Sequence, residues 1–155
     1  VLSGNWDWNV TIASLPYVLG VTTVIFGKHI DKIAIDKEKK IFTLPVVIGE
    51  KFARYAVLTM MILPYFFTIY LIAIKFFMPV MLLVLFAIPT LRKIYPALLK
   101  AKPPERPADF PDGQGGWPLY FAPLAFGNNR AFGLYFMVAL LVDVALRLIF
   151  PTFWI

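Results

Sequence analysis

Four long apolar stretches dominate this chain and restrict what it can fold into. An α-helix needs about 20 mostly apolar residues to cross the hydrocarbon core of a bilayer. The stretches lie at about residues 9–26, 53–74, 76–91 and 131–150. Another apolar segment, 118–126, is too short to span, and we expect it to be interfacial or re-entrant. The pattern predicts an all-α membrane protein, a single membrane domain over residues 1–155 with about four transmembrane helices.

The composition agrees with a protein that lies in a lipid bilayer. Of the 155 residues, 60% are hydrophobic and 15% are charged, whereas soluble domains carry roughly 25% charged residues. The chain has no cysteine, which excludes disulfides, a thiolate nucleophile and cysteine-based zinc sites. The net charge of +6 comes with no nucleic-acid-binding motif, so we expect no nucleic acid as a partner.

The basic residues predict how the chain crosses the membrane. They gather in two loops, at about 27–52 and 92–117, whereas the turn between the second and third stretches holds only Lys75. Cytoplasmic loops carry an excess of lysine and arginine. We therefore predict that both basic loops are cytoplasmic and that both termini lie outside, on the non-cytoplasmic face.

The segment 27–55, GKHIDKIAIDKEKKIFTLPVVIGEKFARY, holds 11 of the 24 charged residues. Magnesium in proteins is held by one or two carboxylates together with substrate phosphates, and lysine or arginine binds phosphate oxygens. Asp31 and Asp36 could supply the carboxylates, and Lys28 and Lys32 the cations. The alternative is a solvated loop whose acids balance its lysines, and the composition leaves both interpretations open.

The order of residues in this segment resembles the second aspartate-rich region of the UbiA superfamily of intramembrane prenyltransferases. The similarity runs through DKIAIDKEKKIFTLPVVIGEKFARY and includes Thr43, Leu44, Pro45, Val46, Gly49, Ala53 and Arg54. The later segment 117–133, WPLYF…AF…NR.FG, is similar to the tail of some branches of that family. The resemblance covers nearly the whole chain and implies the C-terminal half of the UbiA helical bundle.

The resemblance also implies an activity and a site. Members of the family transfer a prenyl group from an isoprenoid diphosphate to a lipophilic acceptor, with Mg²⁺ as cofactor. By this resemblance Asp31 and Asp36 are metal ligands, and Lys28, Lys32 and Arg54 bind the diphosphate. No residue of this chain is assigned a catalytic role.

Two departures from the family pattern shape what we expect of this chain. The family spacing is DxxxD, but Asp31 and Asp36 are five residues apart, so on one continuous helix they would diverge by about 140°. They could share one metal only if the helix ends or bulges near residues 33–35. The first family motif, NxxxDxxxD, is absent from the sequence.

The missing first motif leaves two functions open. The chain could be a prenyltransferase that needs a complementary N-terminal half. It could instead be a non-catalytic UbiA-derived subunit, bound to other membrane subunits in a larger assembly such as a photosynthetic or respiratory complex.

One further pair of charges lies inside an apolar stretch. Asp143 is the only acid within the predicted spans, and Arg147 follows it by four residues. Residues at this spacing are neighbours on one face of a helix. We therefore predict an internal ion pair with a role in helix packing.

Overall fold

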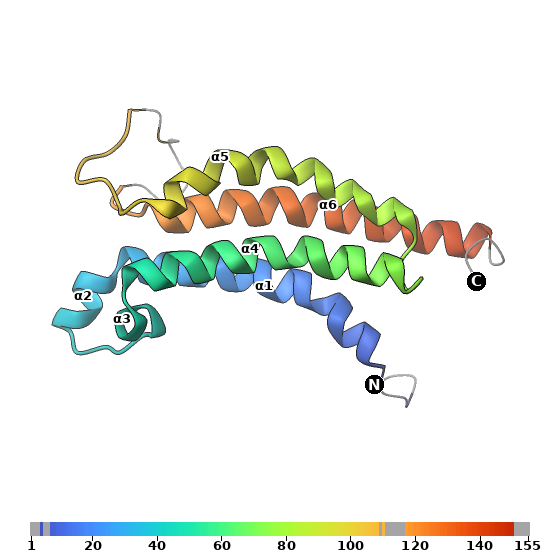
Figure 1. Ribbon diagram of the computed structural model, residues 1–155, viewed down its shortest axis with the longest axis horizontal. Helices are drawn as coiled ribbons and strands as arrows, with labels where there is room; N and C mark the ends of the chain where they lie inside the picture. Colours follow the sequence, from blue (N-terminus) through green and yellow to red (C-terminus); the bar gives the residue numbers. More distant parts are fainter. Residues whose placement is uncertain (1–3, 5–6, 109, 111–116, 151–155) are drawn as a thin grey trace.

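The computed structural model describes residues 4, 7–108, 110 and 117–150 (Figure 1). Every regular element in this part of the chain is a helix, and no strand occurs in it. The elements in order are α1 (Trp8–Asp31), α2 (Ile33–Glu38), α3 (Leu44–Ile48), α4 (Glu50–Ala73), η1 (Pro79–Ala87), α5 (Ile88–Leu99) and α6 (Phe121–Ile149).

Four of the helical stretches are long and apolar enough to cross a membrane. They are Trp8–Asp31, Glu50–Ala73, Pro79–Leu99 and Phe121–Ile149. The predicted fold class, an all-α protein with four candidate transmembrane helices, is confirmed. The chain is therefore a multi-pass membrane protein whose surroundings include a lipid bilayer.

The third span differs from the sequence interpretation. The expected range was 76–91, whereas the structure has a nine-residue 3₁₀ helix, η1, followed directly by the twelve-residue α5. A 3₁₀ helix rises about 2.0 Å per residue and an α-helix about 1.5 Å. Together the two reach about 36 Å, which is enough for a hydrocarbon core of about 30 Å. The amphipathic segment after residue 91 is thus part of the span.

The last span also differs, because α6 begins at Phe121 rather than near residue 131. The expectation of a separate interfacial or re-entrant piece at 118–126 was wrong for residues 121–126, which form the first turns of this helix. Its first backbone N–H groups donate to the carboxylate of Asp31. A helix start needs such acceptors, and this one comes from a residue 90 positions earlier, which local sequence patterns cannot reveal.

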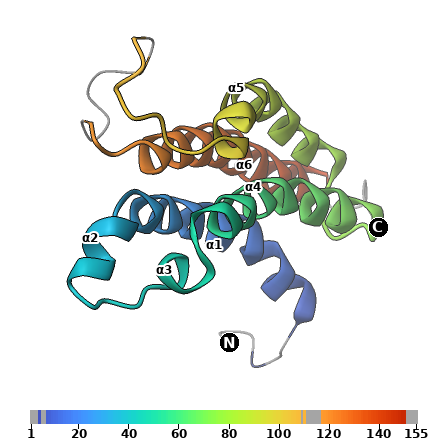
Figure 2. The same cartoon turned by 60° about the vertical axis from the view of Figure 1, so that its left-hand side comes forward.

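α1 packs between α4 and α6 (Figures 1 and 2). Three small buried residues, Gly20, Thr23 and Gly27, lie on its inner face. Gly27 lies against the backbone of Phe121 and Gly20 against Asn129, so α1 and α6 run antiparallel. Small residues allow close approach of membrane helices, where packing drives association.

We predict that Gly27→Ala destabilises the bundle by about 1–3 kcal/mol, the usual cost of overpacking. An added Cβ would lie 2.8 Å from the carbonyl oxygen of Phe121 and 2.9 Å from its carbon, and backbone cannot swing aside as a side chain can. The measurement is the free energy of unfolding in mixed micelles. Gly133→Ala on α6 is the control, since nothing lies within 4 Å of its added Cβ. Equal effects of the two variants would contradict the packing argument.

The two basic loops meet at one end of the bundle. α2, α3 and the segment after α5 lie at the left of Figure 1, whereas the start of α1 and the end of α6 lie at the right. Contacts join the loops directly: Arg54 donates to the carbonyl of Leu98, and the backbone N–H of Lys102 donates to Glu50. We call this the basic end. Which compartment it faces stays a prediction.

We expect the basic end to face the cytoplasm. The chain contains no native cysteine, so single cysteines introduced at Lys39 and Lys75 give clean labelling sites. Both positions are exposed. Lys39 directly follows α2 at the basic end, and Lys75 follows the end of α4 at the opposite end of the bundle. An impermeant thiol reagent applied to intact cells should label the Lys75 variant, and the Lys39 variant only after permeabilisation. Labelling of both from one side would contradict the predicted topology.

Candidate functional site at the basic end

Asp31, the first predicted metal ligand, ends α1 and holds the start of α6. Its Oδ1 accepts the backbone N–H of Phe121 at 3.1 Å, and its Oδ2 accepts that of Ala122 at 2.9 Å. Free N–H groups at a helix start favour an anion. The carboxylate of Asp31 therefore occupies a position at which a phosphate could otherwise bind.

Asp36, the second predicted ligand, lies on the separate helix α2. Lys32 breaks the helix between the two acids, so they do not share one continuous helix. Asp36 is only 8% exposed. Its Oδ2 is 3.6 Å from Nδ1 of His29, too far for a hydrogen bond, and neither buried atom has a hydrogen-bond partner within the described residues. A buried carboxylate oxygen without a donor is costly unless something else binds it.

The predicted diphosphate-binding lysines lie beside these acids along the chain. Lys28 is exposed on the last turn of α1, and Lys32 is partly exposed at the helix break. The structure adds Lys102, whose Nζ donates to the carbonyl of Pro118 and lies 5.0 Å from the ring centroid of Trp117. These lysines make the basic end attractive to anions.

Arg54, the third predicted diphosphate ligand, is held inside the bundle. It is 8% exposed. One of its terminal nitrogens, Nη1, donates to the carbonyl of Leu98 at 3.1 Å, and Nε lies 3.3 Å from the carboxylate of Glu50. Cations near a helix C-terminus interact favourably with its unpaired carbonyls. In this structure Arg54 therefore joins α4 to the end of α5.

The TLPV…G stretch that carries the resemblance builds a short helix and a sharp turn. Thr43 precedes α3, Pro45 lies in its first turn, and Gly49 follows it. Gly49 has φ of +84°, a backbone conformation that favours glycine. The turn at Gly49 separates α3 from α4 and directs the chain into the second span. This part of the pattern is explained by backbone geometry alone.

Two members of this cluster, Glu50 and Lys102, escaped the sequence interpretation. Glu50 contacts Arg54, and the backbone N–H of Lys102 donates to Glu50. Lys102 is 52 positions from Glu50, and no spacing in the sequence indicates that contact. Glu50 could have been found, because it stands four residues before Arg54 and faces it on α4.

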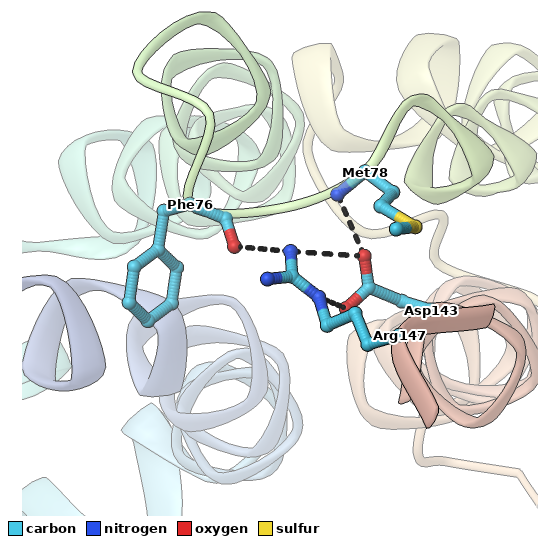
Figure 3. Close-up of polar contacts among 4 residues, drawn as sticks. All are labelled: Phe76, Met78, Asp143 and Arg147. Atoms are coloured by element: carbon cyan, nitrogen blue, oxygen red, sulfur yellow. Dashed lines mark hydrogen bonds and ion pairs between the residues drawn. The ribbon is translucent and has the colours of Figure 1, made fainter. Parts of the chain in front are cut away.

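At the opposite end of the bundle, the predicted pair of Asp143 and Arg147 is confirmed (Figure 3). Nε of Arg147 donates to Oδ2 of Asp143 at 2.8 Å, and Nη2 donates to the carbonyl of Phe76 at 2.8 Å. Oδ1 of Asp143 also accepts the backbone N–H of Met78 at 2.6 Å. The pair thus fastens the turn between α4 and η1 to α6.

The chain matches no protein family, curated protein or solved structure with which it was compared.

Proposed function

We propose that this chain is the diphosphate-binding half of an intramembrane prenyltransferase of the UbiA type. The observation that carries the proposal is Asp36, a buried carboxylate with an oxygen that lacks a hydrogen-bond donor within the described residues. Asp36 lies on the short helix α2, at the end of the bundle where the lysines gather. An isoprenoid diphosphate presents an anionic head and an apolar tail, which suits the end of a membrane-spanning bundle.

The residues present fit a magnesium ion held mainly by substrate. Magnesium usually takes one or two protein carboxylates and completes its shell with water and substrate phosphates. Asp36 fits as a ligand through its unpartnered oxygen. Asp31 stays a predicted second ligand, since each carboxylate oxygen has a further lone pair beyond its bond to α6. No cluster of three histidine or acidic side chains suited to a metal occurs in the described part of the chain.

The other predicted residues would have separate roles at the diphosphate site. Lys28 and Lys32 would neutralise the diphosphate oxygens, while Arg54 keeps α4 joined to α5 through Leu98. Bound magnesium would stabilise the departing diphosphate. The family resemblance supplies the reaction, transfer of the prenyl group to a lipophilic acceptor, and the absent first motif implies that a complementary N-terminal half completes the site.

The second candidate function is that of a non-catalytic subunit within a larger membrane assembly. Two contacts favour it: Asp31 holds the start of α6, and Arg54 holds the end of α5. Residues that bind substrate in the family would then stabilise the fold of this chain instead. Other membrane subunits would be its partners.

Reconstitution separates the two candidates. The chain in liposomes should release no diphosphate from a prenyl diphosphate by itself. Addition of an N-terminal half that carries NxxxDxxxD should produce magnesium-dependent release. Asp143→Asn should retain that release, because Asp143 lies in the turn network at the other end. Absence of release from every reconstituted pair, with stable association of the chain with other membrane subunits, would favour the second candidate.

A further inference from the structure

Three exposed cations lie well inside two of the candidate spans. Arg92 and Lys93 belong to Pro79–Leu99, and Arg130 belongs to Phe121–Ile149. We call them the span cations. The predicted apolar stretches ended before Arg92 and began after Arg130, so only the observed lengths of α5 and α6 place these residues within spans. None of the three makes a hydrogen bond or an ion pair within the described residues.

The other two spans indicate where the hydrocarbon core lies. Residues 8–27 and 55–74, which make up most of α1 and α4, include no charged residue. Each of these stretches has 20 residues and is therefore about 30 Å long, which matches the thickness of a typical hydrocarbon core. The first stretch ends at Gly27 and the second begins after Arg54, so the boundary of the core at the basic end lies near these two residues.

The span cations lie deep relative to this boundary. The start of α6 packs against Gly27, and Arg130 is nine residues beyond that start, about 13 Å deeper. Leu98 contacts Arg54, and Arg92 comes six residues before Leu98, about 9 Å deeper. Charged side chains within a membrane are costly, and they almost always face protein or water and pair with other groups. The faces of α5 and α6 that carry the span cations are therefore unsuited to contact with lipid tails.

Lipid headgroups are also poorly placed to neutralise these charges. Long basic side chains near a span end usually extend along the helix to the nearer interface. In an α-helix, however, the Cα–Cβ bond tilts toward the helix N-terminus. Because α5 runs toward the basic end, these bonds of Arg92 and Lys93 tilt away from the nearer boundary. The bond of Arg130 tilts toward it, but from a depth of about 13 Å.

A second copy of this chain would not neutralise the span cations. In a symmetric dimer the same surface of both subunits meets, so the cations of one copy would face those of the other at equal depth. Asp143, the acid of the last span, is buried in its own pair with Arg147. A partner that pairs with the span cations is therefore a different protein, with carboxylates of its own at this depth.

The exposed face of α6 has the spacing of a helix–helix interface. Exposed residues recur on it every three or four positions, a heptad pattern that suits a partner helix and that many membrane helices share. They are Arg130, Leu134, Met137, Leu141, Val144 and Leu148. Gly127 precedes them on the same face, and nothing lies within 4 Å of a Cβ added there. The backbone of α6 is therefore open to close approach beside Arg130.

We propose that the outward faces of α5 and α6 bind transmembrane helices of a different protein, whose carboxylates pair with the span cations. One helix of that protein lies along the exposed face of α6 and presents an acid to Arg130. Such a protein fits both candidate functions, as the complementary half of the enzyme or as a neighbouring subunit. The pairing does not depend on the diphosphate chemistry at the basic end, so each proposal can fail alone.

Synthetic transmembrane helices test this proposal with the full chain in phosphatidylcholine liposomes. The probes are leucine-rich helices with a central glutamate, leucine or lysine, and binding is measured by energy transfer from a fluorophore on the chain. The glutamate helix should bind at least about tenfold more tightly than the leucine helix, the equivalent of one charge-assisted contact. The lysine helix should bind no more tightly than the leucine helix. Equal binding of the glutamate and leucine helices would overturn the proposal.

A matched pair of variants locates the binding. Arg130→Leu should weaken binding of the glutamate helix roughly tenfold, and the variant should fold because Arg130 makes no bond within the described residues. Lys39→Leu removes an exposed cation at the basic end and should leave binding unchanged. Equal effects of the two variants would indicate attraction by net charge and overturn the proposal. The preference for glutamate should persist in liposomes that contain phosphatidylglycerol, and its loss there would assign the span cations to lipid headgroups instead.

Discussion

Asp36→Ala is expected to lower magnesium-dependent diphosphate release by the reconstituted pair at least about 100-fold. Loss of even an outer-shell partner of a metal typically costs 10–100-fold, and Asp36 is the better placed ligand of the two predicted ones. The measurement is the rate of release from a prenyl diphosphate at saturating magnesium. The same variant should also retain its fold, because it removes a buried carboxylate whose Oδ2 has no hydrogen-bond donor within the described residues.

Glu38→Ala is the matched control for this experiment. Glu38 lies on the same helix, α2, carries the same charge and is exposed. Its removal should change turnover less than about twofold, the small effect typical of exposed surface positions. A similar loss in both variants would indicate a general effect of charge at the basic end. Unchanged release in the Asp36 variant would contradict the site assignment.

Stability supplies a second test of Asp36, independent of turnover. Some residues are retained for function although they destabilise the fold, and replacing such a residue often stabilises the protein. Without magnesium, the Asp36→Ala variant should therefore have a melting temperature no lower than that of the original chain. A marked decrease in melting temperature would indicate that Asp36 holds the basic end together, as Asp31 does through α6.

The apolar stretches predicted the spans because hydropathy is a local property of the sequence. α4 at Glu50–Ala73 lies close to the predicted 53–74. The ends of α5 and α6 depend instead on distant residues. α5 continues to Leu99, whose neighbour Leu98 is fully buried and accepts from Arg54. α6 starts at Phe121 because Asp31 accepts its first N–H groups. Contacts between residues so far apart in the sequence leave no pattern in a short stretch of it.

The candidate site was predictable in its residue types and not in its contacts. The spacing of Asp31 and Asp36 made a shared metal depend on a helix end or bulge near residues 33–35, and the structure has a helix break at Lys32, directly after Asp31. The two acids contact different partners: Asp36 lies near His29, and Asp31 accepts backbone N–H groups at the start of α6. The spacing of two residues in the sequence determines the relative direction of their side chains on one continuous helix, but not across a helix break.

Asp143→Ala is expected to destabilise the bundle by about 3 kcal/mol, within the range for breaking a buried ion pair by removal of one partner. Arg147 would lose its carboxylate, and the backbone N–H of Met78 would lose its acceptor in a buried position. The measurement is the free energy of unfolding in mixed micelles. The α4–η1 turn should also become accessible to protease, because these bonds fasten it to α6.

The chain provides its own control in a second pair with the same spacing. Glu50 and Arg54 are also an acid followed four residues later by an arginine, but here the arginine is the buried partner. The side chains of Glu50 and Arg54 are 40% and 10% exposed, against 5% for Asp143 and 40% for Arg147. Glu50→Ala should cost less than Asp143→Ala, because the buried Arg54 keeps its hydrogen bond to the carbonyl of Leu98, whereas Asp143→Ala also removes the acceptor of the Met78 N–H.

The double variant Asp143→Leu with Arg147→Met should recover part of the loss, since it removes both charges of the pair. We expect incomplete recovery, because the backbone N–H of Met78 would still lack its acceptor and the carbonyl of Phe76 would still lack its donor. Equal costs for Asp143→Ala and Glu50→Ala would contradict the argument that the additional bond from Met78 to the buried Asp143, rather than the spacing of acid and arginine, decides the cost of removing the acid.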